Sequence, residues 1–285
     1  MIALFAFSRT LHFASLMSVF GAAALLLQAR GLGVDGTGLR KLLGAAAFTA
    51  LATAVLCLCG AGGEMSGDLT AGFEPQVMGS VIAGTYYGHV FLVRIALLVG
   101  VALLSLADGA FLWKALLSGA ALAALGLTSH AAASGTPRYE LLRAANDSLH
   151  LLASAFWVGG LVVLVPEVWR RTPQLVGLLT LFSRWGVASV AVLVIAGTLN
   201  GVFILGQEGM PWNGTYVTLL AAKIVLAAAM VALALTNRFG VLPALARGEE
   251  EAAETIPLTV SAELGAALAI LVIVGFLGLT APMQM

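Results

Sequence analysis

The sequence predicts an all-α polytopic membrane protein, and its composition, its apolar segments and the charges of its loops all favour that fold class. Hydrophobic residues make up 60% of the 285 residues, whereas charged residues make up only 10%. Because soluble domains carry roughly a quarter charged residues, this composition excludes an ordinary soluble protein. The formal net charge of zero argues against a nucleic acid as a partner.

Eight segments are apolar over the roughly 20 residues that a helix needs to cross a bilayer. In chain order they cover residues 2–29, 41–62, 86–106, 111–133, 143–166, 178–206, 215–237 and 258–281. The first segment has no small-residue cleavage site followed by a polar start, so we interpret it as a span rather than a signal peptide. The sixth is long, which predicts a helix that tilts or extends beyond the bilayer.

The loops between these segments alternate in charge. Loops 30–41 and 167–184 each contain three basic residues, whereas loop 63–85 contains three acidic residues and no basic one. Because basic loops stay in the cytoplasm, the pattern predicts an N-out and C-out topology. Loop 134–142 departs from the pattern, since it contains Arg138 and is predicted outside.

Polar residues of the first four segments recur in order in the last four. The matched positions are His12 with His150, Gly21 with Gly159, Cys57-Leu-Cys59-Gly60 with Thr198-Leu-Asn200-Gly201, Tyr87 with Tyr216, and Arg94 with Lys223. Chance similarity between apolar segments is the alternative. We favour two related four-helix halves, 1–134 and 135–285, related by an axis along the membrane normal.

All four histidines lie within predicted spans, and the predicted topology places them in the outer part of the membrane. They are His12, His89, His130 and His150. An ionisable side chain is costly in hydrocarbon and therefore marks a functional site. Neutral imidazole ligates copper, zinc and haem iron. A single histidine at a helix end more often bonds a carbonyl or lies at headgroup level, so we predict that at least two ligate a metal together.

Asp147 lies three residues before His150 and shares its helix face. A carboxylate there can hold one imidazole nitrogen and leave the other for a metal. Ser154 and Trp157 continue that face. Further supporting or pathway candidates in the outer half or near mid-depth are Cys57, Cys59, Asn200, Arg94 and Lys223, and Glu263 is expected near the cytoplasmic start of the last span.

The two cysteines lie two residues apart on one predicted helix, so their side chains diverge and we expect no disulfide between them. As ligands, Cys57 and Cys59 would favour Cu(I), although cysteine is also a common packing residue in apolar helices. The sequence contains no phosphate-binding Gly-rich loop, no Cys-x-x-Cys-His and no His-Glu-x-x-His. We assign no catalytic residue and expect a protein that is not an enzyme.

Short motifs in both halves resemble those of the copper-resistance protein D (CopD) family. They are Thr85-x-Tyr87-Gly88 with Arg94, Ser129-His130-Ala131, Asp147-x-x-His150, Phe156-Trp157-Val158-Gly159-Gly160-Leu161, Tyr216 with Lys223, and Glu263. The resemblance extends over nearly the whole chain, and residues 130–280 are its more diagnostic part. The family's Thr-x-Tyr-Gly pattern is degraded around Tyr216, where Gly214 and Thr218 stand.

This resemblance implies a multi-pass protein of the bacterial inner membrane that carries copper from the periplasm toward the cytoplasm. It also implies a periplasmic copper-binding partner of the CopC type. We therefore predict a copper transporter or channel whose outer ligands are His12, His130 and His150, with His89 and Asp147 in support. The ion would then pass between the halves, past Cys57, Cys59 and Asn200.

Two other functions use the same residues. A b-type haem protein would take histidines on two helices, such as His12 and His150, as axial ligands and pass electrons to or from quinone. A membrane-bound metal sensor or chaperone-docking subunit would bind copper and move nothing. A Soret band identifies the first alternative, and a vesicle flux assay separates the second from a transporter.

Overall fold

The structure is a computed structural model that describes residues 1–34, 36–128, 137–205 and 214–280, and every regular element in these ranges is helical. The α-helices are α1 (Ile2–Gln28), α2 (Arg40–Ser66), α3 (Pro75–Gly84), α4 (Tyr86–Ser105), α5 (Phe111–Gly126), α6 (Pro137–Arg170), α7 (Leu175–Leu205), α8 (Gly214–Thr236), α9 (Leu242–Ala246) and α10 (Glu250–Leu277). A π-helical turn, Asn237–Val241, joins α8 to α9.

Within the described residues, seven helices are long and apolar enough to cross a membrane. They are α1, α2, α4, α6, α7, α8 and α10, which confirms the all-α polytopic class. The predicted segment 111–133 corresponds to α5, an apolar helix of 16 residues that ends at Gly126. Residues 129–133 of that segment lie outside the described ranges.

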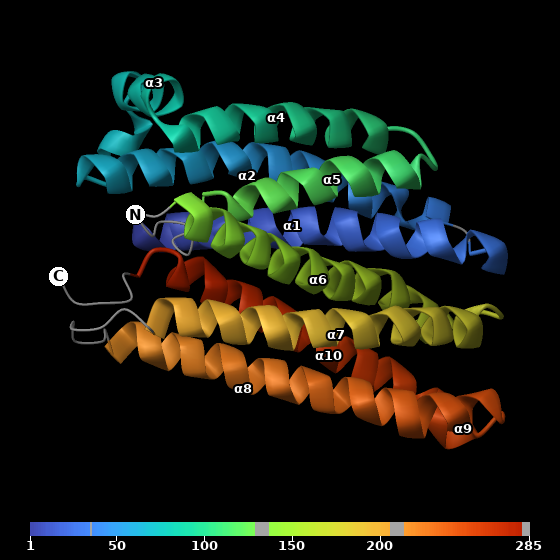
Figure 1. Ribbon diagram of the computed structural model, residues 1–285. Helices are drawn as coiled ribbons and strands as arrows, with labels where there is room; N and C mark the ends of the chain where they lie inside the picture. The colour runs from blue at the N-terminus through green and yellow to red at the C-terminus, as the bar shows by residue number, and fades with distance from the viewer. Residues whose placement is uncertain (35, 129–136, 206–213, 281–285) are drawn as a thin grey trace.

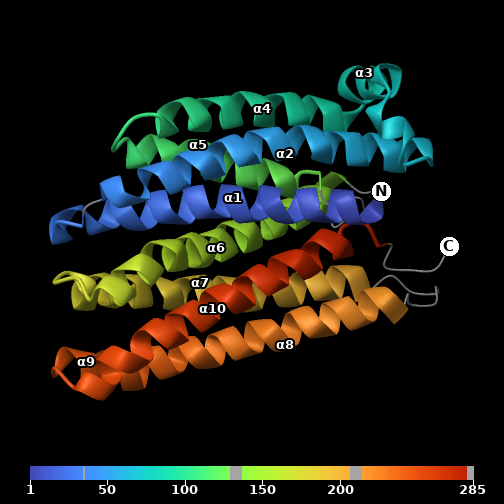
Figure 2. The ribbon, with the colours of Figure 1, turned by 180° about the vertical axis from the view of Figure 1, so that it is seen from behind.

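The long helices lie side by side in one bundle (Figures 1 and 2). α1 runs through its middle and packs against α2, α5, α6 and α10. Helices α2, α4 and α5 lie on one side of α1, whereas α7 and α8 lie on the other side of α6 (Figure 1). α1 begins and α10 ends at the same end of the bundle, next to α3, and α9 lies at the opposite end (Figure 1).

The two central helices, α1 and α6, approach each other at a pair of glycines. A Cβ atom placed on Gly21 would lie 2.8 Å from the Cα of Gly159, and one placed on Gly159 would lie 2.6 Å from the Cα of Gly21. Gly21 also faces the carbonyl of Ala155 in α6, and Gly159 faces the carbonyl of Met17 in α1. Small residues are required at such crossings because any side chain would separate the backbones.

Loop 63–85 folds into a compact cap instead of the plain loop that the sequence suggested. The 3-10 turn Ala71–Phe73 and α3 pack on the end of α2. Pro75 occupies the first turn of α3, a position that tolerates the missing N–H of proline. Thr85 then caps α4, since its Oγ1 accepts a 2.9 Å hydrogen bond from the Gly88 N–H.

Candidate functional site

His12 of α1 is buried, and both of its ring nitrogens take part in hydrogen bonds. Nδ1 donates to the carbonyl of Ala50 at 2.9 Å, and Arg94 Nη2 donates to Nε2 at 2.8 Å. A carbonyl only accepts and a guanidinium only donates, so these two bonds place the ring proton on Nδ1. The Nε2 lone pair is therefore occupied by Arg94, and a metal ion would have to displace that guanidinium.

The surroundings of His12 are cationic. The fully buried Arg94 interacts with Tyr87 of the same helix, and both Arg94 and Arg9 lie near Cys57 of α2. The Nε atoms of Arg9 and Arg94 have no hydrogen-bond partner among the described residues. Two guanidinium groups in one low-dielectric region repel a copper ion. This cluster on α1, α2 and α4 therefore disfavours a metal site.

A second polar cluster joins α6 to α7 through side-chain amides. Asn146 Nδ2 donates to the Ala196 carbonyl at 2.9 Å and to Asn200 Oδ1 at 2.7 Å. Asn200 Nδ2 in turn donates to Asp147 Oδ1 at 3.1 Å. Lys223 of α8 lies close enough to Asp147 to interact with its charge. The predicted residues Asp147, Asn200 and Lys223 are thus brought together.

His150 lies beside this cluster, and one of its ring nitrogens, Nδ1, has no hydrogen-bond partner among the described residues. Its ring packs on α7, where a Cβ atom placed on Gly197 would lie 3.6 Å from His150 Nδ1. The ring also has a weak polar contact with the backbone of Leu193, which falls short of a hydrogen bond to Nδ1, and it lies near the charge of Lys223. In the part of the chain that the structure describes, His150 Nδ1 is buried and has no hydrogen-bond partner. Asp147 is therefore not a partner of His150 Nδ1, and its Oδ1 accepts from Asn200. The pairing of this carboxylate with the imidazole stays a prediction.

The described histidines do not converge on one point. His12 faces α2 and α4, whereas His150 faces α7. His89 is exposed near the start of α4, and His130 lies outside the described residues. Within the described ranges, no three His, Cys, Asp or Glu side chains are close enough to hold a metal ion together.

The two cysteines are both free, as predicted, and they have different neighbours. Cys57 is half-buried and interacts with Ser8 beside the arginines. Cys59 is buried, and its Sγ lies 4.0 Å from the Sδ of Met78 in α3. Sequence reasoning missed this sulfur pair, because Met78 belongs to a helix that the apolar pattern did not predict.

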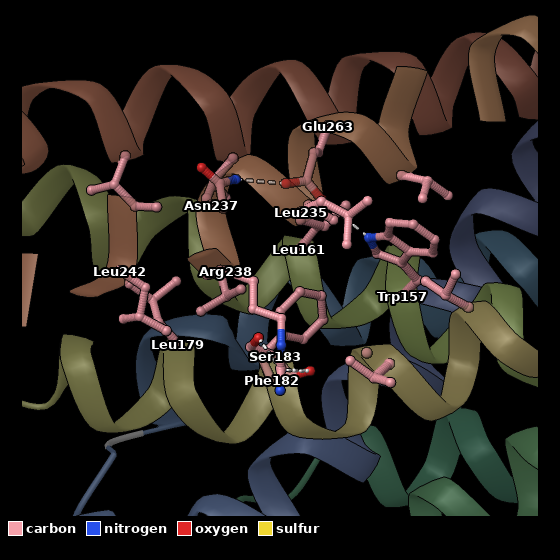
Figure 3. A pocket seen from close by; sticks show the side chains of 18 residues that line it. Trp157, Leu161, Leu179, Phe182, Ser183, Leu235, Asn237, Arg238, Leu242 and Glu263 are labelled. Atoms are coloured by element: carbon pink, nitrogen blue, oxygen red, sulfur yellow. Dashed lines mark hydrogen bonds between the residues drawn. The ribbon is translucent and has the colours of Figure 1, made fainter. Parts of the chain in front are cut away.

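Glu263 is the buried carboxylate of a third polar group, between α6, α8 and α10. Its Oε1 accepts a 2.7 Å hydrogen bond from Asn237 Nδ2, and its Oε2 accepts one from Trp157 Nε1 at 3.2 Å (Figure 3). Thr259 Oγ1 donates to Asn237 Oδ1 at 2.7 Å and so orients that amide. α10 begins at Glu250, so Glu263 lies halfway along this helix. Its position near the cytoplasmic start of the last span stays a prediction.

These groups line a pocket of about 150 Å³ whose walls are mostly apolar (Figure 3). Arg238 reaches across the pocket to α7, where its Nη1 donates to the carbonyl and the hydroxyl of Ser183 at 2.9 and 2.7 Å. The π-helical turn brings the consecutive residues Asn237 and Arg238 to the same pocket, and such turns are frequent at functional sites. Sequence reasoning missed Asn237, Arg238 and Ser183; the only signal was a polar pair at the end of an apolar span.

The chain is similar to proteins of one family along most of its length. Residues 1–140 match the family model "Copper resistance protein D-like, N-terminal domain", and residues 176–277 match "Copper resistance protein D". The chain is 35% identical to "Copper resistance protein D" of Pseudomonas syringae pv. tomato over 265 residues, which cover 85% of this chain and 84% of that protein. It is 28% identical to "Inner membrane protein YebZ" of Escherichia coli (strain K12), over 96% of this chain and 97% of that protein. It is also 33% identical to "Copper transport protein CutJ" of Bacillus subtilis (strain 168), over 36% of this chain and 19% of that protein.

Proposed function

Because the chain belongs to the copper resistance protein D family, we propose that it transports copper across the inner membrane as a multi-pass protein and is not an enzyme. The names of two relatives, one for copper resistance and one for copper transport, support copper as the cargo. The apolar helices support a path through the bilayer, because several of their polar side chains, such as His12, Arg94 and Glu263, are buried inside the bundle.

The single observation that carries the proposal is the unpartnered, buried Nδ1 of His150. A buried polar atom without a partner costs free energy, and a bound metal ion removes that cost. Asp147 supplies negative charge that offsets the positive charge of Lys223 in the same cluster, and its bond to Asn200 orients the carboxylate. We infer that copper is captured here, with His130 as a further predicted ligand from the residues outside the described ranges.

The first cluster has a different role in this proposal. His12 is held between the Ala50 carbonyl and Arg94, so it fixes α1 against α2 and α4. Neither His12 nor Cys57 belongs to the proposed copper path, since both lie beside arginine side chains. His89 also falls outside it, because its side chain is exposed on α4.

The path continues along one face of α6. Asp147, His150, Ser154 and Trp157 are spaced three or four residues apart and therefore share that face. Trp157 donates to Glu263, so the face leads from the captured ion to a buried carboxylate. We infer that Glu263 receives the cation in the inner half, where the sequence offers no histidine or cysteine.

The proposed direction is from the periplasm to the cytoplasm, with an N-out and C-out topology and α5 as the eighth span. The acidic loop 63–85 lies at the end where α1 begins (Figure 1), and the basic loops 30–41 and 167–184 lie at the other end. That distribution supports the orientation through the positive-inside rule. A CopC-type protein would deliver copper at the acidic end.

The same structure supports an internal duplication into halves 1–134 and 135–285. Gly21 and Gly159, matched in the sequence, contact each other, and each faces the carbonyl at the matched position of the other helix. Mutual contact of this kind is what a two-fold axis between α1 and α6 requires. The histidines of the two halves also have corresponding neighbours. The His12 ring contacts the backbone of α2 and the cation Arg94 of α4, and the His150 ring lies near the backbone of α7 and the cation Lys223 of α8.

The test is metal analysis of purified protein before and after copper loading, with an absorption spectrum from the near ultraviolet to the red, followed by copper flux into vesicles. We expect the wild type to bind and move copper without a Soret band. His150→Ala should lose the copper bound at this cluster and so bind less copper per chain, whereas Leu149→Ala, its exposed neighbour, should bind as much as the wild type. Unchanged copper stoichiometry and affinity in His150→Ala would contradict the assignment. A Soret band with stoichiometric iron would replace copper transport by the haem alternative, which the opposed orientations of His12 and His150 do not support.

A further inference from the structure

Two sulfur atoms from different helices meet at the end of the bundle where α1 begins. Cys59 Sγ of α2 and Met78 Sδ of α3 lie 4.0 Å apart. We propose that this pair binds a Cu(I) ion and forms an outer site, distinct from the His150 cluster, at which copper first enters the chain. The proposal rests on the proposed function, because it takes copper to be the cargo.

The spacing of the sulfurs suits one metal ion. At about 2.3 Å from each sulfur, a usual metal–thiolate distance, an ion would see the two sulfurs of this pair at an angle of about 120°. That angle belongs to a three-coordinate site, so one position is left for a donor on the delivering partner or for the next ligand along the path. A site with an open position can pass its ion on.

The cap around α3 holds Met78 in place over Cys59. Gly72 of the preceding 3-10 turn packs directly on the carbonyl of Cys59, and a Cβ atom on Gly63 would lie 2.8 Å from the Cα of Leu69. A Cβ atom on Gly62 would lie 3.4 Å from Val77, the neighbour of Met78. These close approaches fix α3 on α2, so the backbones that carry Cys59 and Met78 are held side by side.

Access and surroundings also suit a soft cation. Cys59 is only 4% exposed, whereas Met78 is partly exposed. The helix α3, to which Met78 belongs, lies at the end of the bundle (Figure 1). Thiolate and thioether sulfur prefer Cu(I) to harder ions. On binding, the Cys59 thiol releases its proton to water at the outer end, and the resulting thiolate and Cu(I) are together neutral. No oxidation or reduction is involved.

The test measures Cu(I) affinity of the full-length protein in detergent, under reducing and anaerobic conditions, by competition with a chromophoric Cu(I) chelator. Cys59→Ser and Met78→Leu should each weaken Cu(I) binding by about tenfold or more, since even the loss of a partner behind a ligand costs about that much and these residues are the ligands themselves. Met65→Leu and Cys57→Ser are the matched controls, since Met65 is exposed at the end of α2 and Cys57 lies with the arginines. The same four changes are measured in the His150→Ala chain, where the outer site alone should remain.

Two further measurements separate this site from simple packing. Met78→Cys supplies a second thiol and should retain Cu(I) binding, which a loss of packing alone would not do. Thermal unfolding shows whether Met78→Leu, a substitution of similar volume, leaves the fold intact. Unchanged Cu(I) affinity in Cys59→Ser and Met78→Leu, or equal loss in the two controls, would overturn the outer site. If the wild type nevertheless moves copper, the proposed function survives that result; a wild type that neither binds nor moves copper overturns both.

Discussion

Gly21 of α1 and Gly159 of α6 are in direct backbone contact at the centre of the bundle, with the Cβ position of either one less than 3 Å from the Cα of the other. The two residues occupy matched positions, each nine residues after a histidine. Because this contact sets how closely the two halves approach, it also determines where the clusters around His12 and His150 lie relative to each other.

Gly159→Val should destabilise the protein by about 1–3 kcal/mol, because the added side chain forces α1 and α6 apart. Thermal unfolding in detergent measures the effect. Gly265→Ala is the control, since nothing lies within 4 Å of a Cβ atom at that position of α10. Equal melting temperatures for wild type and Gly159→Val would show that the helices do not meet at this point.

Arg94→Gln should destabilise the first half by about 1–3 kcal/mol, because a shorter side chain leaves His12 Nε2 buried without its donor. Denaturation in mixed detergent, followed by circular dichroism, gives the difference. Arg40→Gln serves for comparison, since Arg40 is exposed and pairs only at 3.5 Å with Asp108. A larger effect at Arg40 than at Arg94 would refute the structural role assigned to the His12–Arg94 bond.

Asn200→Ala should lower copper affinity by about 10- to 100-fold without removing a ligand, because Asn200 orients Asp147 and is itself held by Asn146. Isothermal titration or chelator competition measures the affinity. Thr198→Ala, an exposed change on the same helix, should bind copper like the wild type. The orienting role fails if both variants bind equally well.

Glu263→Gln should slow copper flux into vesicles while leaving binding at the outer half unchanged, because the amide preserves the size of the side chain but removes its negative charge. The carboxylate that Asn237 and Trp157 hold is then lost as a cation acceptor. Glu254→Gln changes an exposed carboxylate of the same helix and should have normal flux. Wild-type flux in Glu263→Gln would remove Glu263 from the path.

The apolar pattern predicted the long helices closely, and the physical reason is the bilayer itself. α1 spans Ile2–Gln28 where 2–29 was predicted, and α8 spans Gly214–Thr236 where 215–237 was predicted. A chain in hydrocarbon has to satisfy its backbone hydrogen bonds within each segment, so length and hydropathy suffice to locate a helix. The short helix α3 lies in the cap, outside the long apolar segments, so length and hydropathy did not predict it.

The sequence by itself determined the membrane class, the family resemblance, and which rare polar residues deserve attention. Only the tertiary structure decided what those residues contact. It turned His12 toward Arg94 and left His150 Nδ1 without a partner among the described residues. It also placed Met78 on Cys59 and Asn237 on Glu263. Hydropathy records how much a residue prefers lipid to water, whereas side-chain partners depend on helix rotation and crossing, which small residues such as Gly21 and Gly159 set through close packing.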